Sequence, residues 1–337
     1  GSWSPVNSGT STDLLIEDTV SGIDIPVGEQ AVIDITVRLT DTATNVAGLE
    51  FTNTAAFSYN QLDNDGSSRL QGEPGASALM TIVEPDLTLE KSGPAQLRLG
   101  QPGAFALNVH NVGDSPAYAV SITDVLPSTA EGGMCDAAPV NVVVQRYAAD
   151  GTTMLAPALV EGTDFTLTFV GDPNCRLTLE MLTPEAAIGP DERLVVTYDA
   201  SLDGDTQRDA VMTNVAGATQ WFSLDISNAA VAGNARTYTR LLTDGTPGTL
   251  DHEDAHTAVE FTPLINFEKT VMNLSSGDNP ATAAAPGDLL RYTLRVESAS
   301  DTDVNNLAIV DELDRLNAIS AYEPGTLNIV TLPAGAD

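Results

Sequence analysis

The chain has few basic side chains, few aromatic side chains and no long apolar run. Lys and Arg total 14 against 47 Asp and Glu, so the 337 residues carry a formal net charge of −33. This excess of negative charge argues against nucleic acid and anionic membrane surfaces as partners. No window approaches the roughly 18 consecutive apolar residues of a membrane-spanning helix, so no membrane insertion is predicted.

Aromatic residues make up only 5% of the chain, which leaves little material for a sugar-binding platform of exposed rings. The motifs of common enzyme classes are also missing, since we find no catalytic Ser-His-Asp set, phosphate-binding loop or nucleotide fingerprint. Counting alone does not exclude a carboxylate pair for glycoside hydrolysis, because acidic residues are abundant. The chain is nevertheless not predicted to be an enzyme.

Cysteine is scarce, and Cys135 and Cys175 are the only two. In an exported chain such a pair favours one disulfide, and the alternative is two unrelated buried thiols. His252 and His256 lie four residues apart, but the helical context of a zinc site is missing, so a solvated acidic loop is the better interpretation. No cofactor is expected from these residues.

One acidic turn has some features of a cation site. The segment Asp63-Asn-Asp65-Gly66 supplies the oxygen ligands and the glycine of half a calcium loop. The full helix-loop-helix pattern of such a loop is missing, so solvated turn carboxylates are the favoured interpretation. Asp63 and Asp65 are kept as candidate calcium ligands.

Val, Ile, Thr and Leu alternate with polar residues from end to end, between turns of Gly, Asp, Asn and Pro. Segments 31–38, 104–110 and 193–198 are typical, and no segment shows a long helical period. Side chains alternate between the two faces of a strand, so such segments fit half-buried strands. Short strands with this punctuation predict an all-β fold of antiparallel sandwiches.

Two sequence patterns each occur twice at matching spacing. Each pattern begins with a glycine, continues through an alternating apolar segment and ends at a polar residue. The spacing is 24 residues in the first pattern and 25 in the second, for the pairs Gly100/Asp124 and Gly287/Asp311, and Gly28/Asn53 and Gly189/Asn214. In the first pattern, Phe105 and Tyr292 each follow the glycine by five residues. One repeat unit therefore holds a lysine- and aspartate-bearing half followed by an asparagine-bearing half.

These halves divide the chain into three parts. Residues 86–264 hold both halves and are predicted to form one complete repeat. Residues 1–85 hold the C-terminal, asparagine-bearing half, and residues 265–337 hold the N-terminal, lysine-bearing half of a further repeat. We therefore expect the chain to begin and end in the middle of a repeat.

A lysine occupies an apolar face in the first strand of each lysine-bearing half. Lys91 shares a face with Leu87 and Leu89, and Lys269 is placed in the same way. An isolated ammonium is costly to desolvate, so an inward lysine must be paired, deprotonated or reacted. The neighbouring acid Glu90 points to the opposite face and is therefore not the expected partner.

The aspartate and the asparagine of the repeat also lie on apolar faces. This holds for Asp124 and Asn214 and for their counterparts in the partial halves, Asp311 and Asn53. Three polar residues at such positions, each found twice, are more than composition would produce. Without a reaction, the arrangement would be a buried Lys–Asp ion pair with an asparagine that satisfies backbone groups.

The motifs together resemble a known family. A Glu-Lys pair, Gly-x-x-x-x-Phe/Tyr, Ile-Thr-Asp-Val-Leu-Pro and Thr-Asn-x-Ala are similar to the Ig-like "conserved repeat domain" of large bacterial surface proteins, which was long catalogued as a domain of unknown function. The resemblance covers essentially the whole chain and implies tandem Ig-like antiparallel β-sandwiches, one complete and two partial. The last unit departs from the pattern, because Asp311 is followed by Glu-Leu-Asp without the proline.

The order of lysine, aspartate and asparagine also resembles the collagen-adhesin A-type domain of surface adhesins. That family forms a spontaneous isopeptide bond between a lysine and an asparagine, with an aspartate as the acid. Burial suits this chemistry, because it lowers the pKa of a lysine and raises that of an aspartate. The resemblance implies one set of Lys91, Asp124 and Asn214 and a split second set of Lys269, Asp311 and Asn53.

These resemblances imply an exported, extracellular protein at a bacterial cell surface. We expect a stalk, adhesin shaft or fibre segment that resists unfolding and is stabilised by intramolecular Lys–Asn bonds. The partial halves would complete one another, either head to tail between chains or as neighbouring repeats of one polypeptide. The alternative is a module that binds an extracellular glycan or protein through its loops, and a third interpretation is an accessory domain of a secreted hydrolase.

Overall fold

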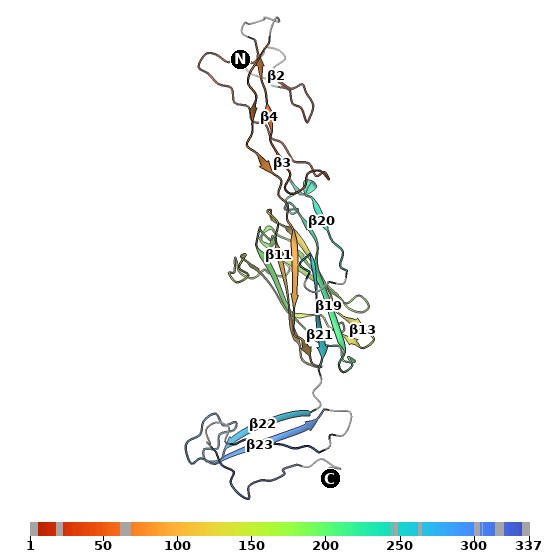
Figure 1. Cartoon of the computed structure of the whole chain (residues 1–337), viewed down its shortest axis with the longest axis vertical. Coiled ribbons are helices and arrows are strands. Elements are labelled where there is room, and N and C mark those ends of the chain that lie inside the picture. Colours follow the sequence, from red (N-terminus) through yellow and green to blue (C-terminus); the bar gives the residue numbers. More distant parts are fainter. Residues whose placement is uncertain are drawn as a thin grey trace.

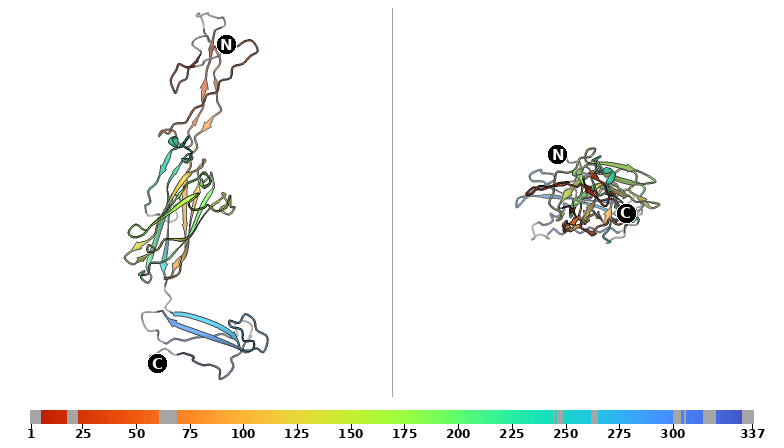
Figure 2. Two further views of the ribbon diagram at one scale, coloured as in Figure 1. Left: turned by 180° about the vertical axis from the view of Figure 1, so that it is seen from behind. Right: turned by 90° about the horizontal axis from the view of Figure 1, so that it is seen from above.

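The computed structural model describes residues 6–17, 23–60, 69–243, 245, 249–261, 265–299, 304, 306–313 and 320–331. Across them the chain is elongated, with a central sandwich between an N-terminal ladder of short strands and a C-terminal hairpin (Figures 1 and 2). The helices in these ranges are two short 3-10 turns, Pro184–Ala186 and Ala232–Asn234. No helix of the described residues is long and apolar enough to cross a membrane. The predicted all-β fold class is confirmed.

Two sheets, antiparallel except for one pair of strands, form the central sandwich. The first has the order β15 (Val140–Tyr147), β18 (Arg193–Ala200), β11 (Gly103–Asn111) and β9 (Leu87–Ser92). The second has the order β10 (Gln96–Leu97), β21 (Glu253–Glu260), β19 (Val211–Phe222), β12 (Tyr118–Val125), β17 (Arg176–Met181) and β16 (Phe165–Val170), with β20 (Thr237–Thr239) also paired to β19. β10 and β21 are the parallel pair. A small hairpin joins β13 (Ser128–Thr129) to β14 (Gly132–Gly133).

The alternation read from the sequence places apolar side chains between these two sheets. In β11 every second residue is buried, including Phe105, Leu107 and Val109. The neighbouring strand β18 buries Leu194, Val196 and Tyr198 against the same core. Full burial of one large apolar side chain stabilises a fold by about 1.5–3 kcal/mol, so a slip by one residue would be costly in every strand.

Strand β9 is the edge of the first sheet and is also attached to the second. It pairs with β11, where Lys91 lies opposite Leu107. The Lys91 N–H donates to Asp254 Oδ2 at 2.8 Å, and the Leu89 N–H donates to the carbonyl of Asp251 at 2.7 Å. Because Asp254 lies in β21, β9 closes one edge of the sandwich.

The N-terminal part is a ladder of two-residue strands. Its antiparallel pairs are β1 (Val6–Asn7) with β2 (Ile16–Glu17), β3 (Glu50–Phe51) with β8 (Met80–Thr81), β4 (Thr54–Ala55) with β7 (Gly75–Ala76), and β5 (Ser58–Tyr59) with β6 (Leu70–Gln71). Such short pairs bury little surface, and most of their residues are exposed.

Residues 31–38, predicted as a strand, form none. Their apolar side chains are exposed instead, with Val32 at 75% and Val37 at 74%. By the spacing from the glycine these residues correspond to β18, which pairs with β11 on one side and β15 on the other. A strand needs partners for its backbone groups, and no described strand pairs with residues 31–38. The prediction failed because strand preference alone does not form a strand.

The C-terminal part is a long hairpin of β22 (Ile265–Asn273) and β23 (Leu290–Ser298). Lys269 lies opposite Leu294 in this hairpin, as Lys91 lies opposite Leu107 in β9 and β11. The hairpin therefore repeats the first two long strands of the central sandwich in the same register. The equivalence inferred from the glycine spacing is thus visible in the strand pairing.

The face that would be buried in this hairpin is open. Phe267 of β22 is 55% exposed. Leu307 and Ile309, which follow the hairpin and precede Asp311, are 51% and 45% exposed. In the central sandwich, the corresponding face of β9 and β11 packs against the second sheet. Among the described residues no second sheet covers β22 and β23.

Candidate functional site

Lys91, Asp124 and Asn214 meet inside the central sandwich from three different strands. Lys91 comes from β9 of the first sheet, whereas Asp124 and Asn214 come from the neighbouring strands β12 and β19 of the second. Their residues are 5%, 0% and 1% exposed, respectively. Glu90 is exposed on the opposite face of β9. The side chains therefore lie on the faces that the alternation predicts.

The hydroxyl of Tyr198 lies at the centre of this group. Lys91 Nζ donates to Asp124 Oδ2 at 2.7 Å and to Tyr198 Oη at 3.0 Å. Tyr198 Oη donates to the same Asp124 Oδ2 at 2.5 Å, and Asn214 Nδ2 donates to Tyr198 Oη at 3.0 Å. Sequence reasoning missed Tyr198, although the alternation of β18 placed a tyrosine on a buried face, where its hydroxyl needs a partner.

Two oxygens of the group have no hydrogen-bond partner among the described residues. They are Asp124 Oδ1 and Asn214 Oδ1, and both are buried. An unpaired buried acceptor typically costs about 1–3 kcal/mol, so a group that leaves two of them unpaired is not optimised for stability alone. A proton on the aspartate would turn one of these acceptors into a donor.

Burial acts against a charge on the lysine and on the phenol of this group. Burial lowers the pKa of Lys91, although the adjacent Asp124 carboxylate acts to raise it. Burial also raises the pKa of Tyr198 well above its usual range, and the charge of Asp124 adds to this shift. Neither a lone ammonium nor a phenolate is therefore favoured in this core.

Lys91 and Lys269 are the only lysines in the chain, and the other twelve of its 14 Lys and Arg residues are arginines. Both stand at the same register position of equivalent hairpins. Arg holds buried carboxylates at least as well as Lys, but its guanidinium stays protonated and is not a nucleophile. The restriction of lysine to these two positions is a signal for amine chemistry that the sequence already contained.

The second set is split between the two ends of the molecule. Lys269 Nζ lies 2.6 Å from Asp311 Oδ1, with side chains 38% and 27% exposed. The same Nζ lies 4.6 Å from the ring centroid of Tyr292. Asn53 is exposed, and the strands that flank it, β3 and β4, lie at the opposite end of the molecule from β22 (Figure 1). Lysine and aspartate are thus together, and the asparagine is elsewhere.

The two sets also differ in which strand carries the tyrosine. In the central sandwich, Phe105 of β11 lies opposite Tyr198 of β18, and their rings stack with centroids 5.5 Å apart. In the second set the counterpart of Phe105 is Tyr292, which follows its glycine by the same five residues. The counterpart of Tyr198, nine residues after Gly28, is Val37. Each set therefore has one tyrosine at these two sequence positions, at that of β18 in the first set and at that of β11 in the second.

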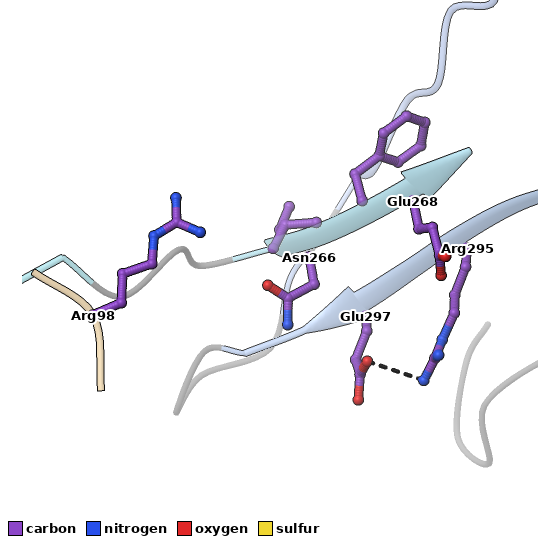
Figure 3. Close-up of a pocket in the computed structure, with 7 residues that line it drawn as sticks. Arg98, Asn266, Glu268, Arg295 and Glu297 are labelled. Carbon is purple, nitrogen blue, oxygen red and sulfur yellow. Dashed lines mark hydrogen bonds and ion pairs between the residues drawn. The ribbon is translucent and has the colours of Figure 1, made fainter. Parts of the chain in front are cut away.

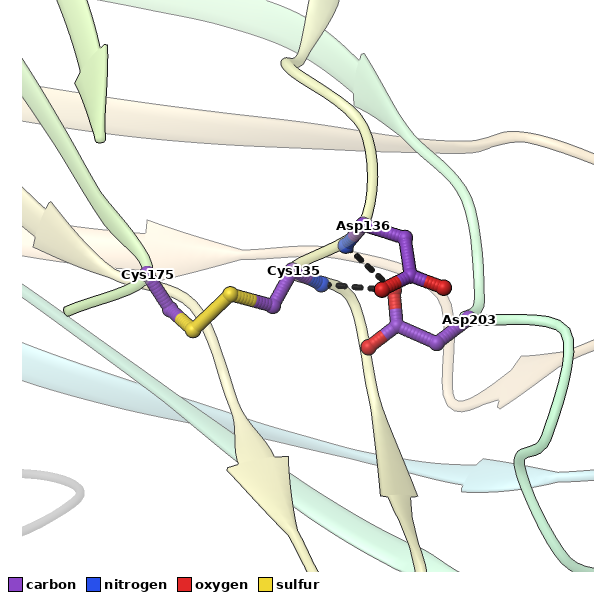
Figure 4. Close-up of a disulfide and its surroundings, with 4 residues drawn as sticks. All are labelled: Cys135, Asp136, Cys175 and Asp203. Atoms are coloured by element: carbon purple, nitrogen blue, oxygen red, sulfur yellow. Dashed lines mark hydrogen bonds between the residues drawn. A yellow bond between two sulfur atoms is a disulfide. The ribbon is translucent and has the colours of Figure 1, made fainter. Parts of the chain in front are cut away.

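The predicted disulfide between Cys135 and Cys175 is confirmed (Figure 4). Cys175 lies between β16 and β17, and Cys135 follows the small hairpin β13–β14. Asp203 Oδ1 accepts hydrogen bonds from the N–H groups of Cys135 and Asp136, each at 2.7 Å. The disulfide and this carboxylate together hold the segment after β14 against the core.

The candidate metal ligands do not form a site in the described parts of the chain. Asp63 and Asp65 lie outside the described residues. His252 Nε2 and His256 Nε2 each hydrogen bond a backbone carbonyl at 3.0 Å. Cys135 and Cys175 bring their sulfur atoms near Asp172, but the sulfurs are bonded to each other and do not serve as ligands.

A shallow pocket lies between the central sandwich and the C-terminal hairpin (Figure 3). It has a volume of about 380 Å³ and is lined by Arg98, Ile265, Asn266, Phe267, Glu268, Arg295 and Glu297. Arg295 is paired with Glu297 at 3.2 Å, and both side chains are more than half exposed. Phe267 is the one aromatic residue among the described lining residues.

No protein-family model matches the chain, and no curated protein matches it. Among solved structures, it is similar to the collagen-binding subdomain of the Enterococcus faecalis surface protein ACE, with 13% identity and a TM-score of 0.28 over 52% of this chain and 96% of that one. It is similar to domains D2 and D3 of the major pilin SpaD from Corynebacterium diphtheriae, with 12% identity and a TM-score of 0.27 over 63% and 72% of the two chains. It is also similar to AvmM, which catalyses macrocyclization in alchivemycin A biosynthesis, with 10% identity and a TM-score of 0.28 over 53% and 90%. Similarities of this degree assign no function.

Proposed function

We propose that the central sandwich forms an intramolecular isopeptide bond between Lys91 and Asn214 and serves as a mechanically stable segment of an exported bacterial surface stalk or fibre. The observation that carries the proposal is the burial of Lys91, Asp124 and Asn214 in one hydrogen-bonded group. Stability alone would not call for this group, because apolar residues in place of a buried ion pair are often neutral or stabilising. The disulfide fits an oxidising compartment outside the cytoplasm.

The reaction requires a neutral amine and an acid at the amide oxygen. The Lys91 ammonium first passes a proton to Asp124 Oδ2, which it contacts at 2.7 Å. The amine then attacks Cγ of Asn214, a Cγ–Nζ bond forms, and the Cγ–Nδ2 bond breaks with release of ammonia. Protonated Asp124 assists by donating to Asn214 Oδ1 as negative charge develops there. The reaction happens once in each molecule, so the protein is not proposed to be an enzyme.

The position of this bond determines what it does under tension. In the central sandwich β9 is the first strand and β21 the last, so a pull on the neighbouring parts of the chain acts on these two strands. A bond from Lys91 to Asn214 would take residues 92–213 out of the stretch that carries tension. The covalent bond, rather than the hydrogen bonds of the sheets, would then limit extension of that part.

Intact mass and amine labelling test the bond directly. Bond formation removes one ammonia, so the purified chain is expected to be lighter than its sequence by that amount. Because the chain has just two lysines, an amine-reactive reagent applied to the denatured protein should label Lys269 and leave Lys91 unlabelled. In the monomeric protein, Lys269 is the internal control for complete unfolding and reaction.

The variants Asn214→Ala and Asp124→Ala provide matched comparisons. Each is expected to keep the full mass, to expose Lys91 to the reagent and to unfold at a lower temperature. Digestion of the wild type should yield one branched peptide that contains both Lys91 and Asn214. Full mass in the wild type, with two separate peptides for these residues, would refute the bond.

The proposal extends to the two partial halves. The hairpin β22–β23 has the register of β9–β11, and its outer edge along β23 corresponds to the edge of β11 that pairs with β18. Residues 31–38 are the counterpart of β18 and have no partner strand among the described residues. We therefore propose that a lysine-bearing half binds an asparagine-bearing half, either of another copy or of an adjoining repeat. A Lys269–Asn53 bond would seal that contact.

A further inference from the structure

The hydroxyl of Tyr198 contacts each of the three groups that the proposed reaction uses. Its oxygen lies 2.5 Å from Asp124 Oδ2 and 3.0 Å from Lys91 Nζ and from Asn214 Nδ2. The phenol thus stands between the nitrogen that attacks and the nitrogen that leaves. Both contacts are short enough for direct proton transfer through the hydroxyl.

The reaction also needs a proton to move from Lys91 Nζ to Nδ2 of Asn214, and Asp124 makes no hydrogen bond to that Nδ2 among the described residues. After attack, the new Cγ–Nζ bond leaves a positive charge on Lys91 Nζ, while Nδ2 of Asn214 must gain a proton to depart as ammonia. The one hydrogen bond that Asn214 Nδ2 makes to a described residue is the bond to Tyr198. Asp124 Oδ2 already accepts from Lys91 and Tyr198, and the proton that the carboxylate takes from Lys91 is the one expected to be donated to Asn214 Oδ1.

We propose that Tyr198 is the proton relay of isopeptide formation, passing a proton from Lys91 Nζ to the departing Nδ2 of Asn214. This inference rests on the proposed function. In the relay, Tyr198 Oη takes one proton from the positively charged Nζ and gives its own hydroxyl proton to Nδ2. The Cγ–Nδ2 bond then breaks, ammonia leaves with three hydrogens, and Nζ keeps the single hydrogen of an amide. Tyr198 ends as it began, and no oxidant or further reactant is needed.

A concerted relay is consistent with the surroundings of the phenol. Burial and the charge of Asp124 raise the pKa of Tyr198, so a phenolate would be a poor intermediate. In a concerted transfer the oxygen gains one proton as it loses another, and the phenolate never forms. The hydroxyl hydrogen is free to rotate toward Nδ2 once Asp124 has taken up the lysine proton and needs fewer donors.

The second set supplies an independent observation. Tyr198 corresponds to Val37 there, but Phe105, which lies opposite Tyr198, corresponds to Tyr292. Lys269 Nζ lies 4.6 Å from the centroid of the Tyr292 ring. A ring for packing alone would be satisfied by phenylalanine at either position. Each set thus has one phenol at these two positions, Tyr198 in the first and Tyr292 in the second, although the sequence position differs.

The rate of bond formation in freshly made full-length protein tests the relay. The chain is synthesised in a cell-free system, and intact mass follows the loss of ammonia with time. Y198F is expected to form the bond at least roughly a hundredfold more slowly than wild type, which is the lower range for a lost acid–base group. Y147F, in the same sheet but outside the group, is the matched control and should react at the wild-type rate.

A double variant separates a relay from a packing role. F105Y/Y198F moves the hydroxyl to β11, as in the second set, and is expected to recover most of the lost rate. A packing role predicts instead that Y198F loses stability in urea without losing rate. Equal rates for Y198F and wild type, or a slow double variant that is folded, would overturn the relay and leave the bond itself intact.

Two outcomes of these measurements need separate treatment. If wild type never loses ammonia, the proposed function fails, and the relay fails with it. If Y198F does not fold, the rate of wild type is measured in mixtures of light and heavy water. A relay with two protons in flight predicts a curved dependence on the deuterium fraction, and a straight line would overturn it.

Discussion

Lys91 is held in surroundings that act on its charge in opposite directions. Its Nζ lies 5.6 Å from the ring centroid of Phe105 and 5.4 Å from that of Tyr198, and both ring faces attract a cation. Asp124 at 2.7 Å and the charge of Asp254 also favour the ammonium. Desolvation is nevertheless the largest effect and lowers the pKa of Lys91. The protonation state of this lysine is therefore coupled to folding.

This coupling predicts how stability depends on pH in a chain that lacks the bond. In Asn214→Ala, Lys91 binds fewer protons in the folded than in the unfolded state between its lowered pKa and its ordinary value of 10.5. The free energy of unfolding should therefore rise with pH across that interval. Above about pH 10 the raised pKa of Tyr198 acts oppositely, because the unfolded phenol loses its proton first.

Urea unfolding at several pH values from about pH 7 to about pH 10 measures this dependence. Asn214→Ala/Lys91→Met should lose the rise, whereas Asn214→Ala/Lys269→Met should keep it, because Lys269 is partly exposed. A free energy of unfolding that does not change with pH in Asn214→Ala, or the same rise without Lys91, would show that folding does not lower the pKa of this lysine.

At the scale of strands, the alternation of apolar and polar residues predicted the buried faces correctly, whereas strand preference predicted one strand that does not form. The buried faces of β9, β12 and β19 followed from a period of two. The sequence therefore predicted that Lys91, Asp124 and Asn214 point into the core, although it did not give the distances between them. Tyr198 lay on a face that was predicted correctly, but alternation gives the side of a strand and not its neighbour across the sheet. Residues 31–38 were predicted wrongly because pairing, which the sequence pattern does not contain, decides whether a strand forms.

The disulfide connects elements that no sheet pairing joins directly. Cys175 lies in the turn between β16 and β17, and Cys135 lies in the segment between β14 and β15. The bridge spans 40 residues, for which the chain-entropy account gives a stabilisation of about 4 kcal/mol. Asp203 also accepts hydrogen bonds from the N–H groups of Cys135 and Asp136, so the bridge is not the segment's single tie among the described residues.

Cys135→Ser/Cys175→Ser is expected to lower the free energy of unfolding by about 2–4 kcal/mol, since the unfolded chain gains freedom. Urea unfolding with and without a thiol reductant measures the effect. The reductant should destabilise the wild type and leave the double variant unchanged. A wild type that yields two reactive thiols when denatured without reductant would contradict the bridge, and a double variant as stable as wild type would contradict its role.

Over the whole molecule, Arg236 joins the N-terminal ladder to the central sandwich. Its Nε lies 2.6 Å from Asp41 Oδ1, its Nη2 donates to the carbonyl of Thr42 at 2.7 Å, and its Nη1 is paired with Glu84. Arg38 adds a hydrogen bond of 2.9 Å to Asn234 Oδ1. These interactions are polar, and most of them are made by one guanidinium, in contrast to the apolar core of the sandwich.

The open halves at the two ends of the molecule are expected to drive assembly. The exposed apolar face of β22–β23 and residues 31–38, which pair with no described strand, both favour association, because unpaired strand edges and apolar surface are costly in water. A head-to-tail contact that does not close into a ring propagates as a filament. Concentrated protein should therefore form filaments. On an SDS gel these should give a ladder of multimers where a Lys269–Asn53 bond has formed.

Lys269→Arg is the matched variant for this assembly, since it keeps a cation beside Asp311 but supplies no amine that forms an amide. It should still associate, but its assemblies should dissociate to monomers in SDS. Asn53→Ala should behave in the same way, while residues 86–264 keep their own Lys91–Asn214 bond in both variants. A strictly monomeric wild type at high concentration would show that the halves do not join between copies. In that case the lysine-bearing half would need its partner from an adjoining repeat, and a chain extended by one further asparagine-bearing half should bury Phe267 and shield Lys269 from amine reagents.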